Sequence, residues 1–293
     1  MFQIRYIEGK PKTLKMITCH LLGGLGNQLF QIFTTIAYAI QCNQTFGFLN
    51  TYYVESCSKR HSYWNSFLLN IKQNTYPSLS SEYEIISENH FHYKELPVNK
   101  NESSKKLVGY FQSYKYFDAY FETICGMISL PFLKSQVTTE YSYPIPYDKL
   151  ISLHFRLGDY KKLPDYHPIL PIEYYIHSLK SIVKNSSDVY NVLYFCEKDD
   201  NDDVDLKINK LKEEFPTIKF MKADDSIVDW KQMLMMSCCK HNIIANSSFS
   251  WWAGYFNTNN GKIVCYPAVW FGVKLKQHLL CDLFPQSWKK IEW

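Results

Sequence analysis

A histidine, an arginine and an aspartate lie close together in the chain, at His154, Arg156 and Asp159. The apolar run from Leu150 to Phe155 predicts a strand in which alternate side chains share a face, so His154 and Arg156 project together. If the sheet is parallel, this is the carboxyl end of a strand, where open α/β sheets bind ligands. Arginine offers a planar fork of donors that matches phosphate oxygens. The motif therefore predicts a site for an anionic group. A salt bridge that only closes a turn is the alternative.

A glycine-rich turn lies between an expected strand at 16–22 and an expected helix at 27–42. Its glycines include Gly24 and Gly26, which precede Asn27. The backbone amides of such a turn can receive a phosphate or a sugar hydroxyl. The dinucleotide fingerprint is not met, because a leucine stands where the third glycine is required, and the Walker lysine is absent. A purely structural turn is the alternative.

A second polar cluster follows an expected strand at 241–245. It consists of Asn246, Ser247, Ser248, Phe249 and Ser250. Short hydroxyl side chains at a helix start can cap the helix, and they can also hydrogen-bond a phosphate or a ribose. Capping explains one serine but does not readily explain four polar positions. The tryptophan pair that follows, Trp251 and Trp252, is expected in the core.

An acidic run at 199–205 is the candidate for metal chemistry. Asp200 and Asp202 form the Asp-x-Asp pattern of metal-dependent sugar transferases. No histidine accompanies them, and arginine with helix dipoles can offset a diphosphate without a cation. We therefore expect a solvated loop and no metal. A metal-dependent transferase that uses another nucleotide sugar is the alternative.

The composition is that of an ordinary globular protein. The 293 residues carry a formal net charge of +4 with scattered Lys and Arg, which argues against a nucleic-acid partner. The nine cysteines lack disulfide or zinc spacing and indicate free thiols. No apolar stretch near the amino terminus is long enough for a signal peptide or a membrane span, so we expect a cytoplasmic protein without a transmembrane segment.

The order of the expected elements predicts an α/β protein with two domains. From residue 150 onward, strands alternate regularly with helices, which is the pattern of a doubly wound parallel sheet. The expected strands are 150–155, 190–195, 217–222, 241–245 and 262–266, and the expected helices are 171–184, 204–214, 227–238 and 250–257. A loop-rich aromatic stretch at 50–106 precedes this half. The polar stretch 135–148 is the expected linker between an amino-terminal domain at 1–140 and a Rossmann-type domain at 141–293.

Three motifs in fixed order resemble those of the α-1,2-fucosyltransferases, of the glycosyltransferase family 11 type. They are Gly-Gly-Leu-Gly-Asn-Gln-Leu-Phe-Gln at 23–31, His-Phe-Arg-Leu-Gly-Asp-Tyr at 154–160 and Asn-Ser-Ser-Phe-Ser-Trp-Trp-Ala at 246–253. With smaller matching pieces, the resemblance covers nearly all of the chain from Met16. It implies a GT-B-like pair of Rossmann-type domains, a GDP-fucose donor, a galactose-terminated glycan as acceptor, inversion at the anomeric carbon and no essential metal.

The resemblance also implies roles by position. Arg156 would bind the diphosphate, His154 and Asp159 would shape the same site, and 246–250 would line the donor pocket, to which Gly24 and Gly26 add their turn. Asn27 would orient donor or acceptor. His154 and Asp159 are the candidate bases, and the sequence does not choose between them.

The chain departs from the family pattern at Leu157, where a second arginine is common. This leucine counts against any role that needs two adjacent cations. Two rival functions are a carbohydrate-binding protein that has lost its chemistry and a nucleotide-dependent oxidoreductase. The missing third glycine weakens the second rival. No pattern in the sequence predicts the acceptor, the linkage or the oligomeric state.

Overall fold

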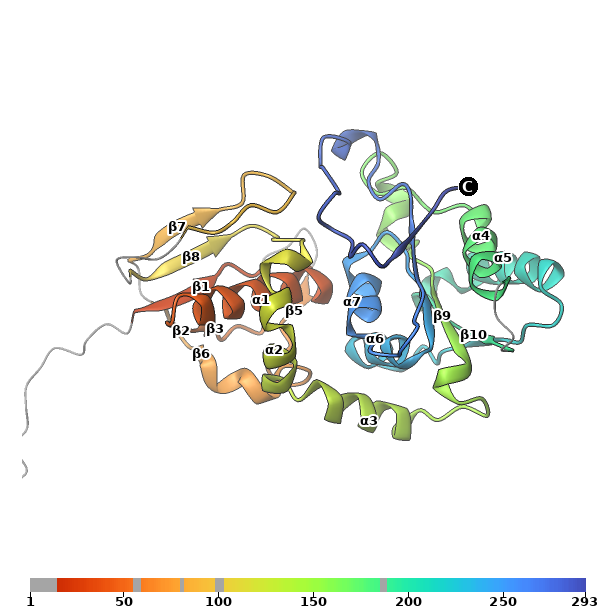
Figure 1. The fold of residues 1–293 in the computed structure, drawn as a ribbon, viewed down its shortest axis with the longest axis horizontal. Helices are drawn as coiled ribbons and strands as arrows, with labels where there is room; N and C mark the ends of the chain where they lie inside the picture. The colour runs from red at the N-terminus through yellow and green to blue at the C-terminus, as the bar shows by residue number, and fades with distance from the viewer. Residues whose placement is uncertain (1–14, 55–58, 80–81, 98–102, 185–188) are drawn as a thin grey trace, which may run out of the picture.

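Two parallel sheets, one in each half of the chain, make up the fold (Figure 1). The computed structural model describes residues 15–54, 59–79, 82–97, 103–184 and 189–293. Within these ranges, no helix combines the length and apolar character needed to cross a membrane. The eight cysteines in these ranges are free thiols. The ninth, Cys57, lies outside them.

The first half contains a four-stranded parallel sheet in the order β2–β1–β8–β7. Its strands are β1 (Met16–Cys19), β2 (Thr45–Phe46), β7 (Glu84–Ser87) and β8 (Lys105–Val108). Helix α1 (Leu25–Gln41) follows the glycine turn, and nearly all of its side chains are buried. The stretch predicted to be loop-rich contains β7. This strand was not predicted because it is an exposed edge strand without an apolar alternation.

Two small sheets complete the first half. Strand β3 (Phe48–Leu49) pairs in parallel with β6 (Thr75–Tyr76), and β4 (Tyr53–Val54) pairs in antiparallel with β5 (Arg60–His61). The second pair is held at the glycine turn, because the Gln28 side chain donates to the carbonyls of His61, at 2.8 Å, and Gly23, at 3.0 Å.

Two helices, α2 (Phe121–Met127) and α3 (Leu130–Glu140), lead into the second half (Figure 1). The expected linker at 135–148 is therefore wrong in its first part, since α3 is helical to Glu140. The sequence of this segment suggested a linker because α3 buries only Leu130 and Val137, which leaves little apolar periodicity. Lys134 of α3 donates to the carbonyls of Ser237 and Phe256, which links α3 to the second half. The division of the chain at 140 stays a prediction.

The second half is a six-stranded parallel sheet in the order β11–β10–β9–β12–β13–β14. Its strands are β9 (Leu150–His154), β10 (Asn191–Phe195), β11 (Phe220–Lys222), β12 (His241–Ile243), β13 (Val264–Pro267) and β14 (Lys289–Ile291). Its helices are α4 (Ile172–Val183), α5 (Asn201–Glu214), α6 (Asp229–Cys238) and α7 (Ser248–Phe256). The predicted alternation is confirmed. The edge strand β14 was not predicted, because two of its three residues are exposed lysines.

The two halves meet where α1 packs against α7 (Figure 1). A Cβ on Gly26 would lie 2.4 Å from the carbonyl carbon of Ser248, so only glycine permits this approach. Trp252 donates its indole N–H to the Gly26 carbonyl at 2.9 Å. Trp251 and Trp252 are buried against Phe30, which confirms that the tryptophan pair belongs to the core. The first turns of α1 and α7 are therefore neighbours.

Candidate active site

A cavity of about 1320 Å³ is lined by residues from both halves of the chain. Ten of the eleven residues predicted for the site line it: Gly24, Gly26, Asn27, His154, Arg156, Asp159, Asn246, Ser247, Ser248 and Phe249. Three motifs that are far apart in the sequence thus converge. Two of them follow the neighbouring strands β9 and β12, whose carboxyl ends lie at one edge of the same parallel sheet. The glycine turn follows β1 of the other sheet and is brought to this edge by the packing of α1 against α7.

Arg156 lies just beyond β9 with 17% of its side chain exposed. Its guanidinium forms ion pairs with Asp159 and Glu197, whose side chains are each about half exposed. Burial disfavours the charged guanidinium, but the two carboxylates outweigh it and raise the pKa of Arg156. The salt bridge expected as the alternative is therefore present. It does not exclude phosphate binding, because both carboxylates also line the cavity and an entering anion can replace them.

His154 ends β9 and is only 7% exposed. Its ring packs against Phe249, and its Nδ1 has no partner among the described residues. Burial, with a smaller contribution from Arg156, lowers the pKa of His154 to about 3. The imidazole is thus neutral near pH 7. It can hydrogen-bond a ligand, but a base with so low a pKa takes up a proton poorly.

The serines at the start of α7 have different roles. Ser247 caps the helix, because its hydroxyl accepts from the Phe249 amide at 3.3 Å. Ser248 donates to Oδ1 of Asn27 at 2.7 Å across the boundary between the halves. Ser250 does not line the cavity, contrary to its predicted donor-binding position. It is fully buried, and its hydroxyl accepts from the Ala245 amide at 3.2 Å.

Asn27 is held from two directions. Its Oδ1 accepts from Gln112 at 2.9 Å and from Ser248 at 2.7 Å. Its Nδ2 would lie 2.6 Å from a Cβ on Gly23, which has φ +78°, so this position requires glycine on both counts. A Cβ on Gly24, in contrast, would meet nothing within 4 Å. The turn thus leaves open space beside the amino terminus of α1.

Asn246 connects three segments around the cavity. Its Nδ2 donates to the carbonyls of Pro168, at 2.9 Å, and Trp270, at 3.2 Å. Its backbone carbonyl accepts from the Tyr160 hydroxyl at 3.0 Å. The side-chain Oδ1 is buried and has no partner among the described residues. Asn246 therefore positions the loop, and its Oδ1 can accept from a ligand.

The acidic run supports the loop that follows Arg156. Asp200 is buried and accepts from the Gly158 amide and from Lys161, each at 2.7 Å. Asp203 also pairs with Lys161 at 2.7 Å. The expectation of a solvated loop is therefore wrong, because Asp200 is buried and the run from Asn201 onward, with Asp202 and Asp203, begins helix α5. Within the described ranges, no group of three or more acidic, histidine or cysteine side chains is arranged to hold a metal ion.

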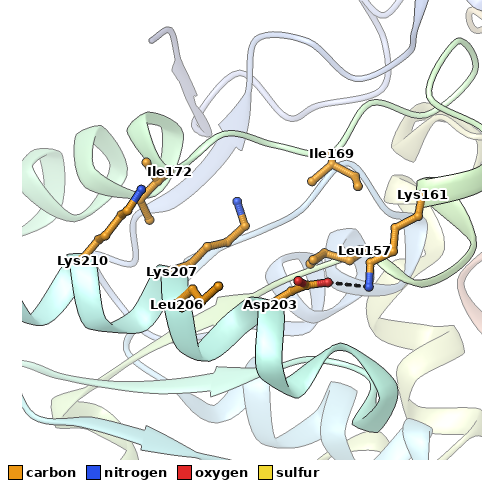
Figure 2. A pocket seen from close by; sticks show the side chains of 8 residues that line it. All are labelled: Leu157, Lys161, Ile169, Ile172, Asp203, Leu206, Lys207 and Lys210. Atoms are coloured by element: carbon orange, nitrogen blue, oxygen red, sulfur yellow. Dashed lines mark ion pairs between the residues drawn. The ribbon is translucent and has the colours of Figure 1, made fainter.

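A second cavity, of about 390 Å³, lies beside α5 (Figure 2). Three lysines line it, but Lys161 is already paired with Asp200 and Asp203, and burial lowers the pKa of Lys207. Leu157 also points into this cavity and not into the large one. Leu157 and Arg156, although consecutive, therefore line different cavities.

Several residues of the large cavity were not predicted individually. They include Arg60, Tyr63, His90, Phe91, Gln112, Asp229, Phe271 and His278. Most belong to segments without helical or strand periodicity, such as the aromatic stretch at 50–106. Only their contacts in the folded protein reveal them.

Comparison with known proteins identifies the family. The model of glycosyl transferase family 11 matches residues 4–292. This chain belongs to glycosyltransferase family 11. The protein is thus a glycosyltransferase, for which a nucleotide sugar and a glycan acceptor are the expected substrates. The predicted family resemblance is confirmed.

Two relatives from Escherichia coli are similar to this family 11 chain. An alpha-1,2-colitosyltransferase is 25% identical over 303 residues, which cover 95% of this chain and 100% of the relative. The O-antigen biosynthesis glycosyltransferase WbnK is 33% identical over 136 residues, 45% of this chain and 42% of the relative. A solved structure, an Arabidopsis thaliana FUT1 variant in complex with GDP, aligns with a TM-score of 0.50 at 11% identity over 88% of this chain and 71% of that one. The family 11 chain therefore has the predicted GT-B-like α/β fold.

Proposed function

We propose that the protein is a galactoside α-1,2-fucosyltransferase, which transfers L-fucose from GDP-fucose to the 2-hydroxyl of a terminal galactoside with inversion. The observation that carries the proposal is the convergence of Arg156 with the first turns of α1 and α7 in one cavity between the halves. A partly buried arginine beside two helix amino termini suits a diphosphate leaving group.

Arg156 and the helix amino termini would bind the GDP diphosphate. The glycine turn brings free amides of α1 to the cavity, because the first intrahelical amide, that of Gln28, bonds to the Gly24 carbonyl at 3.0 Å. As the bond between the fucose anomeric carbon and the phosphate oxygen breaks, GDP leaves with the electron pair. Donors already in place would stabilise this growing charge without a metal ion.

The acceptor 2-hydroxyl would attack the anomeric carbon from the face opposite to GDP, and its proton must pass to a base. Of the two candidate bases, Asp159 is half exposed on the cavity side, whereas His154 is buried and has a pKa of about 3. A carboxylate is therefore a better proton acceptor than His154, and Asp159 can take this role only after the diphosphate has displaced it from Arg156. The neutral His154 would hydrogen-bond the donor or the acceptor.

The donor sugar has one specific alternative. The relative that matches 95% of the chain is an alpha-1,2-colitosyltransferase. Colitose is fucose without the 3-hydroxyl, so the same cavity can serve a GDP-colitose donor. A site that hydrogen-bonds this hydroxyl would strongly prefer fucose, because a buried donor or acceptor would otherwise be left unpaired.

GDP release from purified protein tests the proposal. GDP-fucose and GDP-colitose are each supplied with lactose or N-acetyllactosamine, with and without EDTA. We expect release that depends on an acceptor, resists EDTA and is faster with GDP-fucose. Faster release with GDP-colitose would move the assignment to that donor, and loss of activity in EDTA would favour the metal-dependent alternative. Binding of a galactoside without any GDP release would support the inactive sugar-binding alternative.

A further inference from the structure

Two arginines, one from each half of the chain, share a single carboxylate in the large cavity. Arg156 pairs with Oδ1 of Asp159, and Arg60 lies 3.8 Å from Oδ2 of the same side chain. Both arginines line the cavity. A carboxylate between two guanidinium groups occupies a place where a phosphate group can form equivalent hydrogen bonds.

The position of Arg60 is fixed by the segment around it. The neighbouring His61 carbonyl accepts from Gln28, which joins β5 to the glycine turn. Three residues later, the Tyr63 hydroxyl donates to Asp229 at the start of α6, in the other half. Arg60 is therefore anchored on both sides, with its guanidinium directed at the loop that follows Arg156.

The chain lacks the second motif arginine, but Leu157 at that position faces the separate cavity beside α5 (Figure 2). An arginine or lysine side chain at position 157 would extend into the smaller cavity and not into the large one. Besides Arg156, the cations Arg60 and Lys198 line that large cavity, and Arg60 is the one that contacts Asp159. Its contact with Asp159 is long and its side chain is 38% exposed, so the pair is weak and easily exchanged.

We propose that Arg60 is a second diphosphate-binding residue, supplied by the amino-terminal half of the chain. This inference rests on the proposed GDP-sugar donor. The diphosphate replaces Asp159 between Arg60 and Arg156 and is held from both halves at once. Arg60 thereby contributes to donor affinity independently of the Arg156 motif.

Calorimetric binding of GDP to the wild type and to Arg60→Gln tests the proposal, with Lys59→Gln as the matched control. Lys59 lies next to Arg60 in the chain, but its ammonium stands 4.0 Å from the Tyr53 ring centre and it does not line the cavity. We expect Arg60→Gln to weaken GDP binding roughly 10- to 100-fold. Arg60→Lys keeps the positive charge but lacks the planar guanidinium, so its affinity for GDP should lie between those of the wild type and Arg60→Gln. Lys59→Gln should bind as the wild type does.

Guanosine and Asp159→Asn separate phosphate binding from a structural role. Arg60→Gln should leave guanosine binding, followed by ligand-observed NMR, unchanged. Asp159→Asn should bind GDP at least as tightly as the wild type, because it removes the competing carboxylate. Equal losses for GDP and guanosine, or a loss in Asp159→Asn like that in Arg60→Gln, would overturn the proposal. Unchanged GDP binding in Arg60→Gln would overturn it and leave the donor assignment standing, whereas a wild type that does not bind GDP would overturn both.

Discussion

Arg156 is the residue on which the proposed donor site depends most. Its guanidinium is largely buried, lines the cavity and is oriented by two carboxylates. Arg156→Lys keeps the charge but loses the planar fork that holds a phosphate in two places. We expect kcat/KM for GDP-fucose to fall roughly 100-fold or more, corresponding to about 3 kcal/mol, with little change in thermal stability. The matched control is Lys162→Arg at an exposed position in the following turn, and near-normal turnover of Arg156→Lys would contradict the assigned role.

His154 makes a prediction about acid stability. Its folded-state pKa of about 3 lies below the ordinary value of 6.5, so between these values the folded protein binds fewer protons than the unfolded chain. Stability therefore falls as pH is lowered from 6.5 toward 3, by roughly 4 to 5 kcal/mol from this group. In His154→Gln, the urea concentration at the midpoint of unfolding should therefore depend less on pH between pH 6.5 and 4 than it does in the wild type. The control is His177→Gln, because His177 is exposed. If the urea unfolding midpoints of His154→Gln and His177→Gln depended on pH in the same way, this account would be refuted.

At the scale of single elements, the glycine turn before α1 combines two different requirements. Gly24 has open space around it, whereas Gly26 is in contact with the backbone of Ser248. Gly24→Ala should fold normally but weaken GDP binding about 10-fold, because the methyl group enters the space beside the helix amino terminus. Gly26→Ala should lower the free energy of unfolding by about 3 kcal/mol through forced separation of α1 and α7. Urea denaturation and GDP calorimetry on both variants distinguish these effects. Equal losses of stability and of GDP affinity in Gly24→Ala and Gly26→Ala would contradict the two separate roles.

The sequence predicts elements well where burial imposes a pattern. The strands β9, β10 and β12 are short apolar runs followed by polar residues, and their helices have clear starts, so the order of the second half was predictable. The edge strands β7 and β14 and the exposed helix α3 were missed because one-sided burial leaves no apolar run.

Only those site residues that belong to one of the three sequence motifs could be predicted. Ten of its predicted residues line the cavity, since each follows a buried strand or opens a helix. Ser250 was misplaced because its hydroxyl could equally serve a ligand or the turn, and the sequence does not distinguish these. Arg60 and Tyr63 lie in an aperiodic stretch, and their contacts with the second half depend on the packing of the whole chain.

For the whole molecule, the larger of two hydrophobic clusters is shared by both sheets, whereas the smaller one belongs to the second half alone. The larger cluster contains Ile17 and Phe33 from the first half with Trp252 and Leu193 from the second. Halves that share a core cannot unfold separately without exposing it to water. Differential scanning calorimetry should therefore give one cooperative transition, which GDP moves to higher temperature. Two transitions that respond differently to GDP would contradict a shared core.

The most direct test of the proposed reaction is the structure of its product. GDP-fucose and lactose are incubated with the protein, and the trisaccharide is analysed by NMR. The account predicts an α-linked fucose on O2 of the galactose, with the anomeric configuration inverted from that of the β-linked donor. A β-linked product, or fucose on any other hydroxyl, would contradict the proposed in-line transfer to the 2-hydroxyl.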